Sequence, residues 1–204
     1  MNQRLDSNVL RLLDLEFLKC LEKLTFTTNW ASDSSLGRTL LPRLKLPLTI
    51  TRITLKYTCL KWEELSLLQT LSSLEVLRLI EYACVGPIWN TSELDGFPQL
   101  KYLRFYNLNI KEWIASKDQF PNLEVLVLEN CRKLERIPID FGNLNKLLEI
   151  KLEFCRRSAE GLAREIREEQ RKRNGDDGCL NLLAKDIGWD SLEWSGMSRV
   201  RKWH

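Results

Sequence analysis

The chain has 204 residues, of which 44% are hydrophobic and 29% charged, and its formal net charge is +3. This composition is typical of a soluble folded domain, and so small a net charge does not indicate a nucleic-acid partner. The opening MNQRLDSNVLRLLDLEF breaks its apolar positions with charges and no apolar run is long enough to cross a bilayer, so we expect a cytoplasmic protein without stable membrane insertion.

A short leucine-rich pattern, L-x-x-L-x-L-x-x-(N/C/T), recurs along most of the chain. Its six copies are LEKLTFTTN from Leu21, ITRITLKYT from Ile50, LEVLRLIEY from Leu74, LKYLRFYNL from Leu100, LEVLVLENC from Leu123 and LLEIKLEFC from Leu147. Their starts are 23 to 29 residues apart, within the spacing of roughly 20 to 29 residues that is typical of leucine-rich repeats. The pattern predicts an α/β fold, a leucine-rich-repeat solenoid with a curved parallel sheet on its concave face and irregular or helical segments on its convex face.

Each copy predicts a short strand whose side chains alternate between the interior and the concave surface. In the copy that starts at Leu123, Leu126 and Leu128 are expected to face the interior, while Val125, Val127 and Glu129 face outward. Side chains at the outward positions of successive strands would form one continuous binding face.

The segments between the strands are expected to cover the convex side. Trp62, Trp89 and Trp113 fall in these segments and are expected to pack there as core residues, not to recognise a ligand. Pro138 and Gly142 discourage a long regular helix in the last of the segments.

The sequence divides into three parts. Residues 1–157 are the predicted solenoid, residues 158–177 a capping helix and loop, and residues 178–204 a divergent, weakly ordered tail. The helix is predicted from Ser158 to about Arg173 because SAEGLAREIREEQRKR favours helix and places its acids early and its bases late, as a helix dipole prefers.

The outward strand positions supply the candidate protein-binding residues. They are Arg52, Lys56, Arg78, Tyr102, Arg104, Tyr106, Glu129 and Lys151. Arg78, Arg104 and the two tyrosines are expected on adjacent strands, a mixture of cations and aromatic rings that is enriched in interface hot spots. The competing interpretation is that these residues are simply solvated positions of an exposed sheet.

The sequence carries no motif of a catalytic site. The one histidine is the last residue, His204, and the nine glycines form no phosphate-binding loop. The six cysteines are widely spread and form no C-x-x-C pair, so we expect free, buried thiols and no zinc site. We therefore predict a chain that is not an enzyme and that needs no cofactor or metal.

Several motifs in the second half resemble a known family. They are the F-P-x-L-x-x-L openings at Phe97 and Phe120, the E-N-C-x-x-L-x-x-I-P run from Glu129, and the acidic and basic helix after Cys155. Because of these motifs, residues 40–177 resemble the C-terminal leucine-rich repeats of plant coiled-coil-type nucleotide-binding (NLR) disease-resistance proteins. The resemblance is to late blight resistance proteins in particular.

The resemblance implies a sensor or autoinhibitory region of an intracellular immune receptor that acts in defence. Its partner would be a pathogen effector, a guarded host protein or the receptor's own nucleotide-binding domain. The chain carries neither a coiled-coil nor a nucleotide-binding domain, so it cannot itself be the ATP-driven switch, and we expect a fragment or a truncated homologue.

Two other repeat-protein functions fit the sequence less well. A substrate-recognition subunit of a ubiquitin ligase would need an F-box-like helical module, for which residues 1–20 are too short. The ectodomain of a receptor kinase would need a signal peptide and paired cap cysteines, and the sequence shows neither.

Overall fold

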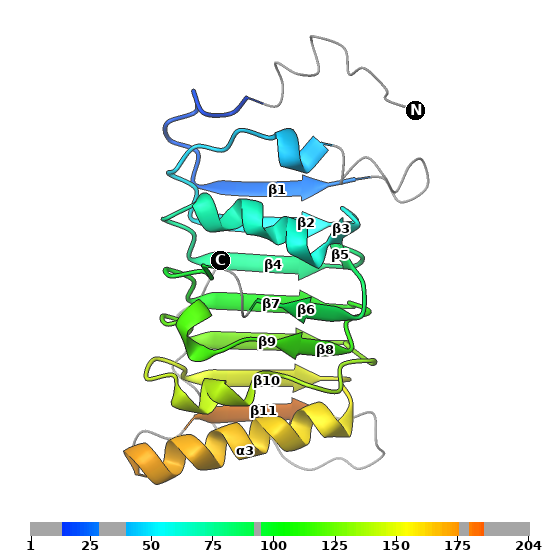
Figure 1. The fold of residues 1–204 in the computed structure, drawn as a ribbon, viewed down its shortest axis with the longest axis vertical. Helices are drawn as coiled ribbons and strands as arrows, with labels where there is room; N and C mark the ends of the chain where they lie inside the picture. The colour runs from blue at the N-terminus through cyan, green and yellow to red at the C-terminus, as the bar shows by residue number, and fades with distance from the viewer. Residues whose placement is uncertain (1–13, 29–39, 92–94, 176–179, 186–204) are drawn as a thin grey trace.

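The computed structural model describes residues 14–28, 40–91, 95–175 and 180–185. Within these residues the main element is a sheet of seven parallel strands whose order in space follows their order in the chain (Figure 1). The strands are β1 (Lys23–Thr27), β2 (Arg52–Lys56), β4 (Val76–Ile80), β7 (Tyr102–Tyr106), β9 (Val125–Glu129), β10 (Glu149–Glu153) and β11 (Asn181–Lys185). The fold is α/β with a mostly parallel sheet, as the sequence predicts, and it is compatible with a repeat solenoid.

The six copies of the leucine pattern form the first six of these strands, which confirms the predicted strand positions. The second and fourth residues of each inner strand point into the interior, and Ile53 and Leu55 of β2 are 1% and 0% exposed. Successive strands pair in the same register, so that Ile53 lies beside Leu77 and Leu55 beside Leu79. Each inner strand therefore buries its apolar residues against both neighbours, which no single copy could do alone.

Short elements return the chain from each main strand to the next. The 3-10 helices are η1 (Leu41–Arg43), η2 (Trp62–Thr70), η3 (Lys117–Gln119) and η4 (Ile139–Asn143). Two small parallel pairs join β3 (Leu60–Lys61) to β5 (Cys84–Val85) and β6 (Ile88–Asn90) to β8 (Glu112–Ile114). Pro138 precedes η4 and Gly142 lies within it, and the segment forms only this short helix, as expected.

Three tryptophans form a stack behind the sheet. The ring centroids of Trp62 and Trp89 are 5.2 Å apart, and those of Trp89 and Trp113 are 5.1 Å apart, with nearly parallel planes. Phe120 and Phe141 meet Trp113 edge-on at 5.4 and 5.1 Å. All three indoles are 2% exposed or less, so the predicted packing role of these residues is confirmed.

Five strands are each followed by a residue with a left-handed backbone. These residues, which follow β2, β4, β7, β9 and β10, are Tyr57, Glu81, Asn107, Asn130 and Phe154, and their φ angles lie between 37° and 57°. Asparagine tolerates this conformation better than most residues with a side chain. Asn130 also donates through Nδ2 to Oδ1 of Asn107 at 2.9 Å and accepts from Nε of Arg132 at 2.8 Å. The chain therefore leaves the sheet by a similar turn after each of these strands.

A helix covers the last part of the sheet, as predicted. α3 (Arg157–Asn174) packs against η4 and β11 (Figure 1). Its buried residues include Ala159, Ala163 and Ile166. Gln170, also buried, donates through Nε2 to the carbonyl oxygen of Leu144 at 3.0 Å. The helix therefore covers apolar groups at this end of the sheet, which fits a capping role.

The strand β11 corrects one prediction. Residues 181–185 were expected to lie in a weakly ordered tail, yet they pair residue for residue with β10, from Asn181 beside Glu149 to Lys185 beside Glu153. This pairing satisfies backbone groups of β10 that would otherwise form a sheet edge. Leu180, just before β11, is 2% exposed and belongs to the core. The remaining predicted tail, residues 186–204, lies outside the described residues.

Most of the described cysteines behave as the sequence predicts. Cys59, Cys84, Cys131 and Cys155 are free and buried, whereas Cys20 is free but exposed and Cys179 lies outside the described residues. Burial raises the pKa of the Cys84 thiol, and a hydrogen bond with Cys155 together with burial raises that of Cys131. These two thiols therefore resist ionisation and act as small interior side chains.

The tryptophan stack predicts a large stability loss on truncation. Trp113→Ala removes a buried ring that contacts Trp89 and two phenylalanines, and we expect it to lower the free energy of unfolding by about 3 to 5 kcal/mol. Trp113→Phe keeps part of the contact and should lose less. Urea denaturation followed by circular dichroism measures both, and equal stability of Trp113→Ala and the parent would contradict the role of the stack.

The left-handed turn predicts a difference between two substitutions of Asn130. Both Asn130→Ala and Asn130→Gly remove the side-chain hydrogen bonds, at a cost of about 1 kcal/mol each. Only alanine adds the steric cost of a left-handed backbone, about 1 to 2 kcal/mol. Asn130→Gly should therefore unfold at a higher urea concentration than Asn130→Ala, and the reverse order would show that this backbone geometry is not maintained.

Candidate functional site

The eight candidate binding residues all lie at the first, third or fifth position of a main strand, and we call these positions the polar face of the sheet. Arg52 and Lys56 lie on β2, and Arg78 on β4. Tyr102, Arg104 and Tyr106 lie on β7, Glu129 on β9 and Lys151 on β10. Each is partly buried, so these side chains lie against their neighbours and do not extend fully into solvent.

The centre of the polar face holds two contacts between an arginine and a tyrosine. The guanidinium of Arg78 lies 5.3 Å from the ring centroid of Tyr102, and that of Arg104 lies 5.5 Å from the ring of Tyr106. Burial raises the pKa of the Tyr102 hydroxyl, against the opposing effect of the two nearby arginines. The tyrosine is therefore neutral at physiological pH and offers its ring face to the cation.

A largely buried carboxylate links three strands beside these contacts. Nε of Arg104 donates to Oε2 of Glu129 at 2.8 Å, and its Nη2 contacts the same oxygen. Nζ of Lys151 donates to Oε1 of Glu129 at 3.0 Å and also pairs with Glu153 at 3.2 Å. The side chain of Glu129 is only 12% exposed, so both of its oxygens are held by cations from the flanking strands β7 and β10.

The surroundings of Glu129 keep it charged. Burial on its own raises the pKa of this carboxyl, but the hydrogen bonds from Lys151 and Arg104 outweigh it, and the pKa lies below its ordinary value. For Lys151, burial favours the neutral amine, but its bonds to Glu129 and Glu153 prevail and raise the pKa. Arg104, Glu129 and Lys151 therefore form a charged cluster that favours one arrangement of β7, β9 and β10.

Four outward positions are less exposed than the alternation of side chains along a strand predicts. They are Val76, Val125, Val127 and Glu149, at 0%, 5%, 5% and 8% exposure. Val127 lies in register between Arg104 and Lys151, and both of these side chains reach along the strand to Glu129. Their aliphatic stems therefore cover the valine, because long charged side chains bury their stems while their charged ends remain paired.

Lys56 has a partner that strand alternation cannot reveal. Its Nζ lies 2.9 Å from Oε2 of Glu81, the left-handed residue that follows β4. Hydrogen bonds from Tyr57 and Lys56 hold the pKa of Glu81 below its ordinary value. Glu81 and Tyr57 both lie just past a strand, where the alternation of inward and outward side chains no longer applies. Their place in the turn is the sequence feature that could have identified them.

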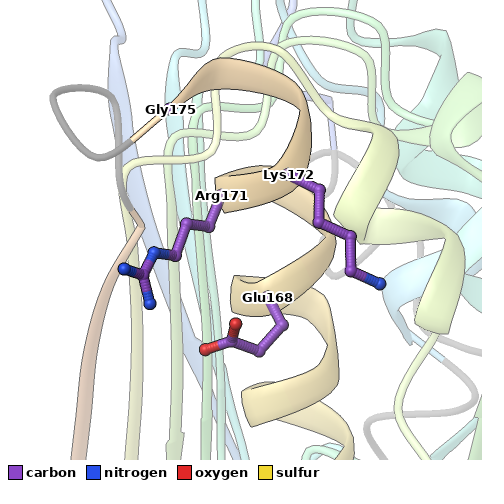
Figure 2. Close-up of a pocket in the computed structure, with 4 residues that line it drawn as sticks. All are labelled: Glu168, Arg171, Lys172 and Gly175. Carbon is purple, nitrogen blue, oxygen red and sulfur yellow. The ribbon is translucent and has the colours of Figure 1, made fainter.

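A hollow of about 330 Å³ lies away from the polar face, at the end of α3. It is lined by Glu168, Arg171, Lys172 and Gly175, and Figure 2 shows the side chains of Arg171 and Lys172 extending to opposite sides of the helix. These groups do not converge on a common point, so the hollow does not resemble a binding site.

The described part of the chain offers neither a metal site nor a membrane span. Among the described residues no group of three or more histidine, cysteine, aspartate or glutamate side chains could hold a metal ion. No described helix is both long enough and apolar enough to cross a membrane. The polar face is therefore the strongest candidate site in this part of the chain.

Comparison with known proteins finds that the chain is similar to putative late blight resistance protein homologs of Solanum demissum. The chain is 37% identical over 119 residues to one of them, covering 57% of the chain and 15% of that relative. It is 36% identical over 124 residues to a second homolog and 32% identical over 134 residues to a third, both of the same species. These matches cover 60% and 65% of the chain but 11% and 10% of the relatives. No family model matches the chain.

The relatives confirm the resemblance to late blight resistance proteins that the Phe-Pro and Glu-Asn-Cys motifs indicate. The chain corresponds to a small segment of those much longer proteins, between 10% and 15% of the three relatives compared.

The charged cluster predicts a pH dependence of stability. The pKa of Glu129 is lower in the folded than in the unfolded protein. Its contribution is therefore present at neutral pH, starts to fall at about pH 5 and is lost as the pH drops through the folded pKa. Glu129→Gln should lower the free energy of unfolding by about 1 to 2 kcal/mol at pH 7, and the difference from the parent should shrink on acidification.

Urea denaturation between neutral and acidic pH measures this effect. Glu165→Gln, which removes an exposed carboxylate of α3, is the control and should track the parent. A constant difference between Glu129→Gln and the parent at every pH would show that the ionisation of Glu129 is not coupled to folding.

Proposed function

We propose that this chain is a leucine-rich-repeat region of a plant disease-resistance protein and that it binds another protein through the polar face of its sheet. The relatives named as late blight resistance protein homologs support the first part. The recurrent leucine pattern and the stacked parallel strands support the repeat architecture, with the polar face as the concave surface of a solenoid.

The observation that carries the binding proposal is the arrangement around β7. Arg78 lies against Tyr102 and Arg104 against Tyr106, and Arg104 is held at its other side by Glu129. Tyrosine and arginine dominate the energetics of many protein interfaces. Side chains that are already held by their neighbours lose less conformational entropy when a partner binds, which favours affinity.

Within the longer protein, we propose that the region acts as a sensor, or restrains an activation domain, in the cytoplasm. Its partner would be a pathogen effector, a guarded host protein or the protein's own nucleotide-binding domain. This role needs binding and no chemistry, so the proposal assigns the region no catalytic activity. Signalling by the whole receptor would depend on parts beyond this segment, since it corresponds to 10% to 15% of the relatives compared.

A capture experiment tests the binding proposal. The full chain is immobilised and exposed to a Solanum leaf extract, beside the variant Arg78→Ala with Tyr106→Ala. Both substitutions truncate the polar face and leave Glu129 between Arg104 and Lys151. A specific partner, identified by mass spectrometry, should be retained by the parent and reduced about tenfold or more by the variant.

The control carries Arg164→Ala and Glu165→Ala on the exposed surface of α3. Circular dichroism verifies that all three proteins are folded. The proposal predicts that the control captures the partner as well as the parent does. Equal capture by the parent and the polar-face variant would place the interface elsewhere on the chain.

A further inference from the structure

Two buried cysteines occupy equivalent places in neighbouring copies of the repeat. Cys131 follows β9 and Cys155 follows β10, each two residues after the end of its strand. The residue between strand and cysteine is left-handed in both copies, with a φ angle of 53° at Asn130 and 55° at Phe154. The two turns therefore begin in the same way, and the cysteines are separated by one strand spacing along the stack.

The pairing of β9 with β10 extends up to these turns. Glu129 lies directly beside Glu153, and the amide of Asn130 donates to the carbonyl oxygen of Glu153 at 2.8 Å. Neighbouring strands lie about 4.8 Å apart, and the Cα atoms of disulfide-bonded cysteines are usually about 4.4 to 6.8 Å apart. A disulfide between Cys131 and Cys155 would therefore fit the stack without a large backbone movement.

The side chains of the two cysteines also converge. Sγ of Cys155 lies 3.3 Å from the carbonyl oxygen of Leu128, so this side chain reaches from the end of β10 toward β9. Sγ of Cys131 lies 3.5 Å from the carbonyl oxygen of Glu129, and a hydrogen bond joins the two thiols. The sulfur atoms are therefore neighbours before any oxidation takes place.

The other two buried cysteines are arranged differently. Cys84 of β5 lies beside Leu60, so Cys59 is out of register with it by one residue. Cys59 has a left-handed backbone, whereas Cys84 lies in a strand. Their side chains therefore do not start from equivalent backbone positions, and this pair serves as an internal comparison for Cys131 and Cys155.

The two thiols of the converging pair have different surroundings. Cys131 is 0% exposed, whereas Cys155 is 8% exposed and is followed by the exposed Arg156. The hydrogen bond with Cys131 lowers the pKa of Cys155 against the effect of burial, while the same bond and burial raise the pKa of Cys131. Because the thiolate is the form that reacts with an oxidant, we expect Cys155 to react first.

We propose that Cys131 and Cys155 form a reversible disulfide when the protein meets a peroxide. The Cys155 thiolate attacks one oxygen of hydrogen peroxide, the O–O bond breaks, and the leaving hydroxide takes up a proton, which gives a sulfenic acid and water. The Cys131 sulfur then attacks the sulfenic sulfur, and its proton leaves with the hydroxyl group as a second water. Two thiols lose two electrons in total, and one peroxide is reduced to two waters.

A small thiol reverses the reaction by exchange, in which two reductant thiols are oxidised as the protein disulfide is reduced. Disulfides in the cytoplasm are usually transient and sense redox conditions, which suits the location proposed for this region.

The disulfide would lie beside the charged cluster of the polar face. Cys131 is two residues after Glu129 and Cys155 two after Glu153, and both of these acids contact Nζ of Lys151. A bond between the turns therefore joins the strand ends that carry this cluster. The inference goes beyond the proposed binding function, which requires no redox chemistry.

Peptide mapping of the oxidised full chain tests the proposal. The folded, reduced chain is treated with hydrogen peroxide, the remaining thiols are alkylated, and the monomer is digested without reductant for mass spectrometry. We expect a predominant cross-link between the peptides that contain Cys131 and Cys155, which a thiol reductant removes. The oxidised chain should also melt roughly 5 to 10 °C higher, because the bond closes a loop in the unfolded chain.

Three variants are each compared with and without peroxide, so that a change in their own stability does not affect the result. Cys155→Ser should abolish both the cross-link and the rise in Tm, whereas Cys84→Ser, which removes another buried thiol, should retain both. Cys131→Ser should leave a sulfenic acid at Cys155 that dimedone traps. A cross-link between Cys59 and Cys84 in equal yield, oxidation without any cross-link, or an unchanged rise in Tm for Cys155→Ser would overturn the proposal.

Discussion

The residue-for-residue register between successive strands sets the arrangement of both faces of the sheet. Because every main strand pairs in parallel at equivalent positions, each kind of side chain lies next to its counterpart in the neighbouring strand. The inward leucine and isoleucine rows, the stacked tryptophans and the asparagines of the turns all follow from this pairing. A shift of one residue would exchange the two faces and bury charges where leucines now pack.

The same register creates an electrostatic cost on the polar face. Residues of like charge become neighbours when successive strands carry them at the same position, as β4 and β7 do with Arg78 and Arg104. Near β9 the cost is removed inside the chain, since Glu129 is placed to accept from both Arg104 and Lys151.

The resemblance to late blight resistance proteins and the geometry of the polar face both support a protein-binding function. They rest on different observations. The relatives indicate the kind of protein to which the segment is similar, and they say nothing about which surface is used. The surface is inferred from the contacts between arginine and tyrosine side chains on β4 and β7. The kind of protein and the binding surface can therefore be tested separately.

Most elements of the fold can be predicted from local periodicity in the sequence. The spacing of leucines was enough to predict six strands, their inward residues and the segments that cover the other side, because alternation in a strand follows from backbone geometry alone. The helix after Cys155 was equally predictable from its composition. The eight candidate residues could be assigned to outward positions for the same reason.

Contacts between strands determine which charges meet and which outward residues are covered. Glu81 compensates Lys56 from a turn on the next strand, and Val127 is covered by side chains from both flanking strands. The strand β11 forms because β10 offers it an edge to pair with and the core accepts Leu180, although the spacing of its own residues does not follow the repeat. Such interactions join residues more than twenty positions apart, and their energies depend on distance and burial, which a linear pattern does not contain.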